Sequence, residues 1–268
     1  MPHYIAALRR CTPALTAACL VALGMARGLA ADDSDPDGGR GIVAAVVDGD
    51  TLSLTDGRTL RLAGIMAPKH GSVDEPLADA ARARLAALAQ GRSVVLAYGS
   101  RHMDRHGRFV AQAWVAGDDG SPGAWLQEAL LADGLARVFS TPDARLRVAE
   151  MLEIEDAARR AGRGLWADPA YRLRTPDDVG KAVDQFQIIE GRAVAVAVVA
   201  SRGYVNFGAD YRTDFTLAFD AAALRLMREA GVDLASFRGH RLRVRGWVRW
   251  FNGPLIDVSH PEQIELLD

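Results

Sequence analysis

The chain has 268 residues, of which 49% are hydrophobic and 25% are charged; this length fits two small domains, and this balance excludes an intrinsically disordered chain. Both cysteines, Cys11 and Cys19, lie in the first twenty residues, which excludes a disulfide framework or a cysteine–zinc site further along the chain. The formal net charge of −2 does not favour long-range attraction to a polyanion, so any nucleic-acid site has to be a local basic patch.

Residues 1–31 have the pattern of an export signal. Two arginines precede an apolar run, Ala14 to Met25, and small residues follow it where a signal peptidase would cut. An uncleaved anchor helix is one alternative, but the run is short for a membrane span of about 20 residues. A lipoprotein attached through Cys19 is less favoured, because apolar sequence continues past it. We expect cleavage, a periplasmic or secreted protein without a membrane span, and a mature chain of 29 basic and 34 acidic residues.

Residues 32–40 are acidic and glycine-rich, which predicts a disordered lead-in. Three strands are then predicted at 42–47, 51–54 and 59–65, because two Asp-Gly turns separate these β-branched or alternating runs. A helix follows from Pro76 to Leu88 and ends at Gly91.

Two more strands are predicted at 93–98 and 109–115, and the loop between them holds three arginines and two histidines. Helices follow at 124–133 and from Thr141-Pro142 onward, the last with an apolar stripe. The stripe consists of Ala144, Val148, Met151 and Ala158. Three strands, a helix and two strands is the order of a five-stranded OB barrel, here with three helices, which we assign to residues 41–170.

The second half of the chain repeats this order. After a polar linker at 171–183, residues 184–268 contain five expected strands and one helix between the third and fourth strand. The expected strands are 188–199, 204–207, 214–219, 241–250 and 255–258, and the helix is 221–230. We therefore expect a second, smaller OB-like β-barrel and an α+β protein that is mainly β.

Four stretches in the first half carry a resemblance to a known family. They are VDGDT at 47–51, RLAGI at 61–65, DRHGR at 104–108 and LLADGLA at 130–136. In this order and spacing they resemble the thermonuclease (staphylococcal-nuclease-like) family over about residues 41–169. The resemblance implies an OB fold, hydrolysis of phosphodiester bonds in DNA and RNA, and Ca²⁺ as the cofactor.

Residue by residue, the resemblance implies that Asp50 is a metal ligand and that Arg61 and Arg108 are the catalytic arginines that clamp the phosphate. His106 stands where the family usually has a tyrosine, and it is expected with Lys69 among the substrate-binding residues.

Met66 and Lys69 occupy the positions where the family has its second metal aspartate and its general-base glutamate. A thioether is not a hard oxygen ligand for calcium, and a protonated amine accepts no proton. We therefore predict a cationic pocket of Arg61, Lys69 and Arg108 that faces one expected carboxylate, Asp50. Replacement bases would have to come from Asp74 or Glu75 before the first helix, or from His70 or His106.

Two functions follow from this departure. The first is an exported phosphodiester hydrolase of this family with an incomplete catalytic set, whose partner is a nucleic acid or a nucleotide. The alternative is a catalytically inactive module of the cell envelope that binds a nucleic acid or a protein. The sequence leaves the oligomeric state and the role of the second domain open.

One strand of the second half carries a basic row on a single face, formed by Arg241, Arg243, Arg245, Trp247 and Arg249. Such a row is typical of a platform for single-stranded nucleic acid. A solvent-facing strand whose arginines pair with neighbouring acids explains it as well, and we favour this second interpretation because the mature chain is acidic.

Overall fold

The computed structural model describes residues 39–71, 75–210 and 212–268. The predicted export signal and nearly all of the predicted lead-in lie outside these residues. Within the described ranges, no helix is long and apolar enough to cross a membrane.

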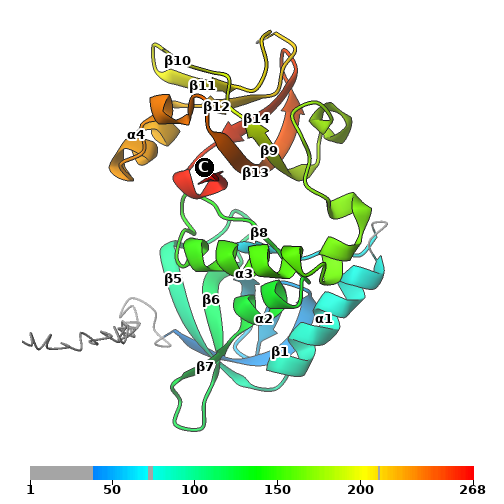
Figure 1. The fold of residues 1–268 in the computed structure, drawn as a ribbon. Helices are drawn as coiled ribbons and strands as arrows, with labels where there is room; N and C mark the ends of the chain where they lie inside the picture. The colour runs from blue at the N-terminus through cyan, green and yellow to red at the C-terminus, as the bar shows by residue number, and fades with distance from the viewer. Residues whose placement is uncertain (1–38, 72–74, 211) are drawn as a thin grey trace, which may run out of the picture. The chain divides into compact units, whose positions relative to one another are not determined.

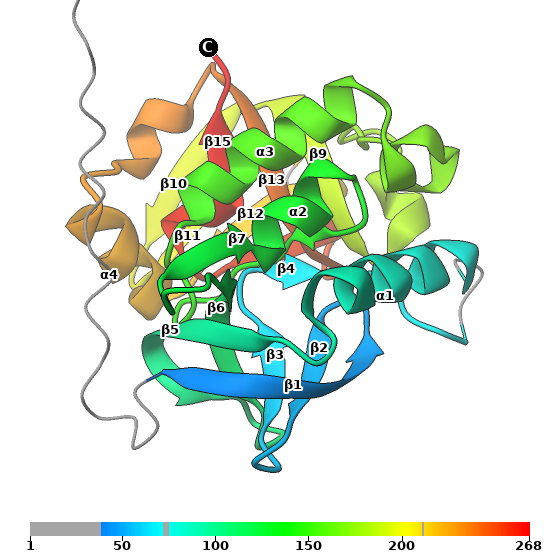
Figure 2. The same ribbon diagram turned by 90° about the horizontal axis from the view of Figure 1, so that it is seen from below.

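The first sheet is a ring of five strands with a sixth at its side (Figures 1 and 2). Its strands are β1 (Arg40–Asp48), β2 (Thr51–Leu54), β3 (Thr59–Leu62), β5 (Ser93–Met103), β6 (Phe109–Ala116) and β7 (Pro122–Trp125). They follow the order β3-β2-β1-β5-β6-β7, and β3 also pairs with β6 in parallel. This closing pair satisfies the backbone groups that would otherwise form two open edges.

Three helices pack beside this ring. They are α1 (Glu75–Ala89), α2 (Leu126–Ala132) and α3 (Val148–Arg160), and a short pair, β4 (Ile65–Met66) with β8 (Arg137–Val138), lies outside the ring. Helix α1 contacts β1, and α2 packs on α3 (Figure 2). All four residues of the predicted stripe are buried, but Ala144 precedes α3, so the stripe on the helix itself consists of Val148, Met151 and Ala158.

Three predicted boundaries in the first half are wrong. The strand expected at 59–65 is split at Gly64, whose φ of +78° turns the chain and whose missing Cβ leaves room for Met151. Strand β5 continues to Met103, which shortens the basic loop to 104–108. Helix α3 begins at Val148 rather than at Thr141-Pro142, because Arg147 adopts a left-handed φ of 61° immediately before it.

The second sheet has seven strands. They are β9 (Phe186–Arg192), β10 (Ala195–Val199), β11 (Arg202–Asn206), β12 (Thr216–Phe219), β13 (Arg241–Trp250), β14 (Pro254–Val258) and β15 (Ile264–Leu266). Helix α4 (Ala221–Glu229) lies between β12 and β13 in the sequence. Strand β12 pairs with β14 in parallel and β9 pairs with β13, so the pairing pattern repeats that of the first sheet. The strand expected at 188–199 is interrupted between β9 and β10.

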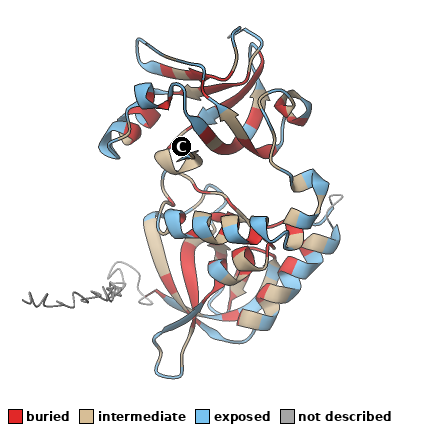
Figure 3. Cartoon of the chain, in the orientation of Figure 1, coloured by how far each residue is buried: buried red, intermediate tan, exposed pale blue. Residues whose placement is uncertain are grey.

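Buried residues lie along the strands of both sheets (Figure 3). One hydrophobic cluster surrounds Leu52, Leu60 and Leu130, and another surrounds Phe215, Leu217 and Val244. The predicted linker contains one short 3-10 turn, η3 (Val179–Ala182), and begins at the end of η2 (Pro169–Tyr171), which follows η1 (Gly164–Ala167).

The basic row of β13 is paired with carboxylates, as the favoured interpretation predicted. Arg243 contacts Glu190, Asp156 and Glu265, and Arg249 contacts Asp257. The expectation of a solvent face is wrong for Arg245, whose side chain is only 2% exposed because it reaches Glu155 of helix α3 at 2.7 Å and Glu265 at 2.8 Å.

Candidate functional site

Asp50 is held rigidly at the turn between β1 and β2. Its amide donates to Asp48 Oδ1 at 3.0 Å, and its own Oδ2 accepts a hydrogen bond from the Ala67 amide at 2.8 Å. A Cβ at Gly49 would lie 2.6 Å from the Ala81 Cβ, so only glycine lets this turn approach helix α1 so closely. The Asp50 carboxylate is consequently buried in a fixed orientation.

Two cations neutralise the buried Asp50 carboxylate. Arg61 Nη1 lies 2.8 Å from Oδ1, and the same guanidinium donates through Nη2 to the Ile65 carbonyl at 2.9 Å. Lys69 Nζ lies 2.5 Å from the same Oδ1. The Arg61 side chain is 13% exposed and the Lys69 side chain is 46% exposed, so Arg61 is enclosed while Lys69 remains accessible to solvent.

Asp48 is a fourth member of this cluster, although the sequence predicts it only as part of an Asp-Gly turn. Its Oδ2 lies 2.7 Å from Lys69 Nζ, so the ammonium bridges two carboxylates. Burial alone would raise the pKa of Asp48, but hydrogen bonds from Lys69 and from the Asp50 amide outweigh it and lower the pKa to about 2. The signal that could have found Asp48 is the spacing of two aspartates on either side of a single glycine.

The charge balance predicted for this pocket is therefore wrong. Two carboxylates face two cations, instead of three cations facing one carboxylate. Arg108 is not in the cluster, because it pairs with Asp104 at 2.7 Å.

The described residues around Asp50 do not fit Ca²⁺. Calcium requires six to eight oxygen ligands, and carboxylates usually supply several of them. Here both oxygens of Asp50 already accept hydrogen bonds or ion pairs, and Lys69 places a positive charge where a metal would have to approach. In the described ranges, no group of three or more His, Cys, Asp or Glu side chains is arranged to hold a metal ion.

Arg108 and His106 belong to a tight loop ordered by Asp104. Asp104 Oδ1 accepts from the amides of His106 at 2.8 Å and Arg108 at 3.0 Å, while its Oδ2 accepts from Arg108 Nε at 2.8 Å. Gly107 supports this turn with a φ of +74°. The hydrogen bonds of Asp104 therefore fix the backbone of the loop that carries His106 and Arg108.

The predicted substrate-binding and phosphate residues line two different cavities. Lys69 lines one of about 450 Å³ together with Met66, Arg137 and Tyr171. The other, of about 650 Å³, is lined by His106, Arg108 and further basic residues of the same region. The structure thus joins Asp50, Arg61 and Lys69 by direct contacts and places His106 and Arg108 in a neighbouring cavity.

Arg61 and Arg108 nevertheless project from the same part of the first sheet. Arg61 of β3 pairs in register with Val110 of β6, and Val110 lines the cavity that contains Arg108. Residues that pair in register share a face of the sheet, so Arg61 and Val110 lie on one side of it, and Arg108 lies in the loop that leads into β6. Across the part of the chain that the structure describes, no hydrogen bond or ion pair joins Arg61 to the Arg108 loop.

The other candidate bases lie apart from this cluster or outside the described residues. His70 Nε2 lies 3.7 Å from Asp79 Oδ1, and both side chains are exposed. Glu75 is exposed at the start of α1, and Asp74 falls in the undescribed segment 72–74. His106, exposed beside Arg108, is the candidate base that shares a cavity with a predicted phosphate arginine.

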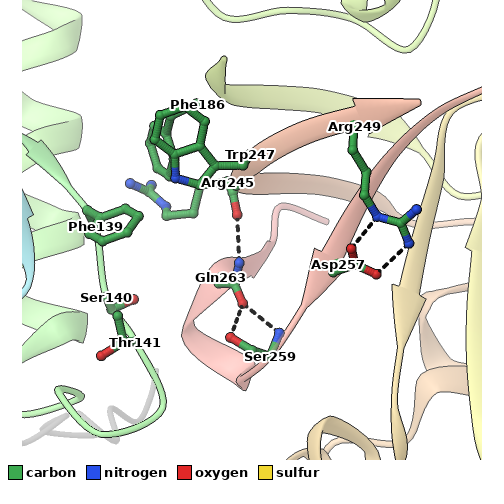
Figure 4. A pocket seen from close by; sticks show the side chains of 11 residues that line it. Phe139, Ser140, Thr141, Phe186, Arg245, Trp247, Arg249, Asp257, Ser259 and Gln263 are labelled. Carbon is green, nitrogen blue, oxygen red and sulfur yellow. Dashed lines mark hydrogen bonds and ion pairs between the residues drawn. The ribbon is translucent and has the colours of Figure 1, made fainter. Parts of the chain in front are cut away.

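Sequence reasoning missed the aromatic wall of these cavities. The Arg137 guanidinium lies over the rings of Tyr171, at 4.8 Å, and Phe186, at 5.0 Å. A third cavity of about 260 Å³, drawn in Figure 4, is lined by Phe139, Phe186 and Trp247 and by polar residues from the end of the chain. Apart from Trp247, which belongs to the basic row of β13, no local motif indicates these residues, because they converge only when the two halves of the chain pack together.

Comparisons with known proteins bear on residues of this site. The sequence matches the family model described as "Staphylococcal nuclease homologue" over residues 59–168. It is also 32% identical over 141 residues to a "Micrococcal nuclease" from Shigella flexneri, a match that covers 48% of this chain and 75% of that protein. The family-model match includes Arg61, Met66, Lys69, His106 and Arg108, while Asp50 precedes it.

Proposed function

This chain belongs to the staphylococcal nuclease family, and from this premise we propose that it binds the phosphodiester backbone of a nucleic acid without calcium. Membership supports a ligand with phosphodiester bonds, since the family acts on DNA and RNA. The local chemistry supports binding rather than calcium-dependent hydrolysis.

One observation carries this proposal. Lys69 Nζ bridges Asp48, at 2.7 Å, and Asp50, at 2.5 Å, so a side-chain ammonium sits beside the carboxylate that the family resemblance assigns to the metal. A fixed ammonium supplies a positive charge without dissociating, but it offers no coordination sites and cannot accept a proton from water. The arrangement keeps a cation at the site and omits the chemistry of a calcium-bound water.

The phosphate contacts would come from accessible cations. Lys69 and Arg137 line one cavity and Arg108 lines the other, so a backbone that crosses both would meet several positive charges. Arg61 has a different role in this proposal, because it is enclosed and holds Asp50 and the Ile65 carbonyl. Arg61 is then a positioning residue that fixes the carboxylate to which Lys69 binds.

A second candidate function is metal-independent phosphodiester hydrolysis with His106 as the base. It is favoured by the position of His106, which is exposed in the cavity that also contains Arg108. A neutral imidazole can accept a proton from water, and an adjacent guanidinium can stabilise the charge that develops on the phosphate.

One assay distinguishes the two candidate functions. It measures the binding and the cleavage of a labelled single-stranded DNA and of a labelled RNA, each in calcium and in chelator. The proposal expects salt-dependent binding, unchanged by chelator, and no cleavage in either condition. Arg108→Ala should weaken binding and lower the slope of log affinity against log salt by about 1. Arg225→Ala, which removes an exposed arginine paired with Glu229 on helix α4, is the matched control and should bind like the wild type. Cleavage in chelator that His106→Ala abolishes would establish the second candidate instead.

A restored variant tests why calcium is not used. Met66→Asp combined with Lys69→Glu replaces the thioether by a carboxylate that can bind the metal and the ammonium by a carboxylate that can accept a proton. If these two residues account for the loss, the variant should bind calcium and gain calcium-dependent cleavage. Unchanged calcium binding in the variant would contradict the role assigned to Lys69.

The pairing of the second sheet supports the proposal that residues 184–268 form a second OB-like barrel after a linker at 171–183, and that residues 41–170 form the nuclease-like domain. The parallel pair β12–β14 and the pair β9–β13 correspond to the closing pairs of the first sheet. We further propose export and cleavage after residue 31, in keeping with the basic, apolar and small residues of the N-terminal segment. Expression of the full chain in a Gram-negative host, followed by fractionation and determination of the mature N-terminus, tests this proposal.

A further inference from the structure

Trp247 is an exposed aromatic side chain that is packed on one side. It lies on β13 directly opposite Phe186 of β9, and the two rings meet edge to face with centroids 6.3 Å apart. Phe139 packs on Phe186 in the same manner at 5.5 Å (Figure 4). Trp247 is 54% exposed, whereas Phe186 is buried, so the indole is the outer member of a supported aromatic row.

The Trp247 side chain lines all three cavities described above. One contains Lys69 and another contains Arg108, while the third is the cavity of Figure 4. An exposed indole thus stands between the two groups of cations that the proposed function assigns to phosphate binding.

The walls of these cavities are more basic than the chain as a whole. Besides the buried Arg245, their Lys, Arg, Asp and Glu side chains are six basic ones (Lys69, Arg101, Arg105, Arg108, Arg137 and Arg249) and four acidic ones (Asp104, Asp143, Asp184 and Asp257). The whole chain carries a formal net charge of −2. Arg105 makes no ion pair with any residue that the structure describes, and its Nε donates instead to His106 at 3.1 Å. The local excess of positive charge is complementary to a polyanion.

We infer that Trp247 is a base-stacking residue and that the ligand of this surface is a single-stranded nucleic acid whose backbone passes from the Lys69 cavity to the Arg108 cavity. This inference rests on the proposed function. Every base has a flat π-face that can stack on an indole, but in a duplex those faces are already covered by neighbouring bases. A single strand can therefore use Trp247, and a duplex cannot.

The inference differs from a platform built by the whole basic row of β13. Arg241 and Arg243 line none of the three cavities, and Arg245 is buried between Glu155 and Glu265. Arg249 lines only the cavity of Figure 4, beside its partner Asp257. The exposed indole is the member of the row that remains to contact a ligand, and the cations come instead from the first half of the chain.

The test compares three probes with the full chain in chelator: a labelled oligothymidylate of about 12 nucleotides, within the usual site size of such folds, an abasic chain of equal length, and a duplex of equal length. Trp247→Ala removes the stacking surface, and Trp247→Phe keeps a ring. Trp250→Ala is the matched control, because Trp250 is 62% exposed on the same strand but lines none of the three cavities.

We expect Trp247→Ala to weaken oligothymidylate binding about 5- to 100-fold, as alanine substitution of a stacking aromatic does, and to leave abasic and duplex binding unchanged. Trp247→Phe should recover most of the affinity, and Trp250→Ala should match the wild type. Quenching of intrinsic fluorescence by oligothymidylate should disappear in Trp247→Ala alone.

Equal affinity of the wild type for oligothymidylate and the abasic chain would overturn the inference, as would equal losses in the two tryptophan-to-alanine variants. If abasic binding persists in those cases and is weakened by Arg108→Ala, the proposed function stands without base stacking. If the wild type binds none of the three probes, both proposals fail and the surface belongs to a ligand of another class.

Discussion

Two clusters in this chain consist of basic side chains paired with carboxylates, but one cluster is buried and the other is open to solvent. Arg245 pairs with Glu155 and Glu265 and is almost fully buried, between helix α3 of the first half and strand β15 of the second. Lys69 and Arg61 pair with Asp48 and Asp50, but Lys69 is 46% exposed and lines a cavity. Enclosure, rather than residue type, therefore distinguishes a structural ion cluster from one that a ligand can reach.

The two clusters also differ in how they titrate. Burial alone would lower the pKa of Arg245, but Glu155 and Glu265 outweigh it and raise the pKa, so the enclosed cluster remains charged. In the open cluster, Asp48 stays ionised down to about pH 2. Both clusters are therefore intact at neutral pH, and their variants can be compared there.

The largest effect is expected at the enclosed cluster. Arg245→Met leaves the Glu155 carboxylate buried without its partner, which should lower the free energy of unfolding by about 3–5 kcal/mol. Urea denaturation measures the change. Arg249→Met, which removes a partly exposed arginine paired with Asp257 on the same strand, should change it by about 1 kcal/mol or less.

A second substitution tests whether the loss of stability comes from the unpaired charge of Glu155. Adding Glu155→Gln to Arg245→Met keeps an acceptor for the Val138 amide, which Glu155 binds at 2.6 Å, and removes the unpaired charge. The double variant should be more stable than Arg245→Met alone. A double variant that is no more stable would show that the loss comes from packing rather than from charge.

The next largest effect is a pH dependence of stability caused by the buried side chain of His260. His260 is fully buried, its ring contacts Ser140 and Ser259 at 2.7 and 2.9 Å, and burial lowers its pKa to about 4. Because its unfolded pKa is about 6.5, the unfolded state binds the extra proton first, and stability falls as the pH drops from 6.5 to 4. This group should account for a loss of up to about 3 kcal/mol.

His260→Gln isolates that contribution, because an amide stays neutral in both states. The difference between the wild-type and variant unfolding free energies should narrow or change sign between pH 6.5 and 4. Difference curves that are flat over this window would contradict the assignment. His240→Gln, at an exposed position, is the control.

A smaller effect is expected at the open cluster. Asp48 has a folded pKa of about 2 against an ordinary value of 3.8, so its ionised form contributes stability above pH 3.8, and this contribution is lost as the pH falls toward 2. Asp48→Asn should therefore lower the free energy of unfolding by about 1–2 kcal/mol at neutral pH. The same comparison by urea denaturation near pH 2 should show almost no difference; an equal loss at both pH values would contradict the ion pair.

The sequence predicted the main strands and helices of both halves in order, because Asp-Gly turns and apolar periodicity are local signals. It did not predict the short strands β4, β7, β8 and β15 or the break between β9 and β10. It also predicted the pairing of the β13 arginines with acids. It could not predict that Arg245 is buried, because Glu155 lies 90 residues away in the sequence and the two meet only through packing. The role of Asp48 was missed for a related reason: its turn is a local feature, but its partner Lys69 reaches it from 21 residues away.

The sequence motifs also do not predict how the Arg61 and Arg108 side chains are oriented. Both arginines occupy the positions that the family resemblance assigns to the phosphate, yet each is oriented by its own aspartate. Phe186 and Trp247 of the aromatic wall come from the second half of the chain, which the family-model match does not include.

The affinity of the wild-type chain for a single-stranded oligonucleotide, measured in millimolar calcium and again in chelator at equal ionic strength, tests the central claim most directly. If the Lys69 ammonium takes the place of a metal, the two affinities should agree within about twofold, a difference of less than about 0.5 kcal/mol. Binding that is lost in chelator, or cleavage that appears only with calcium, would contradict it.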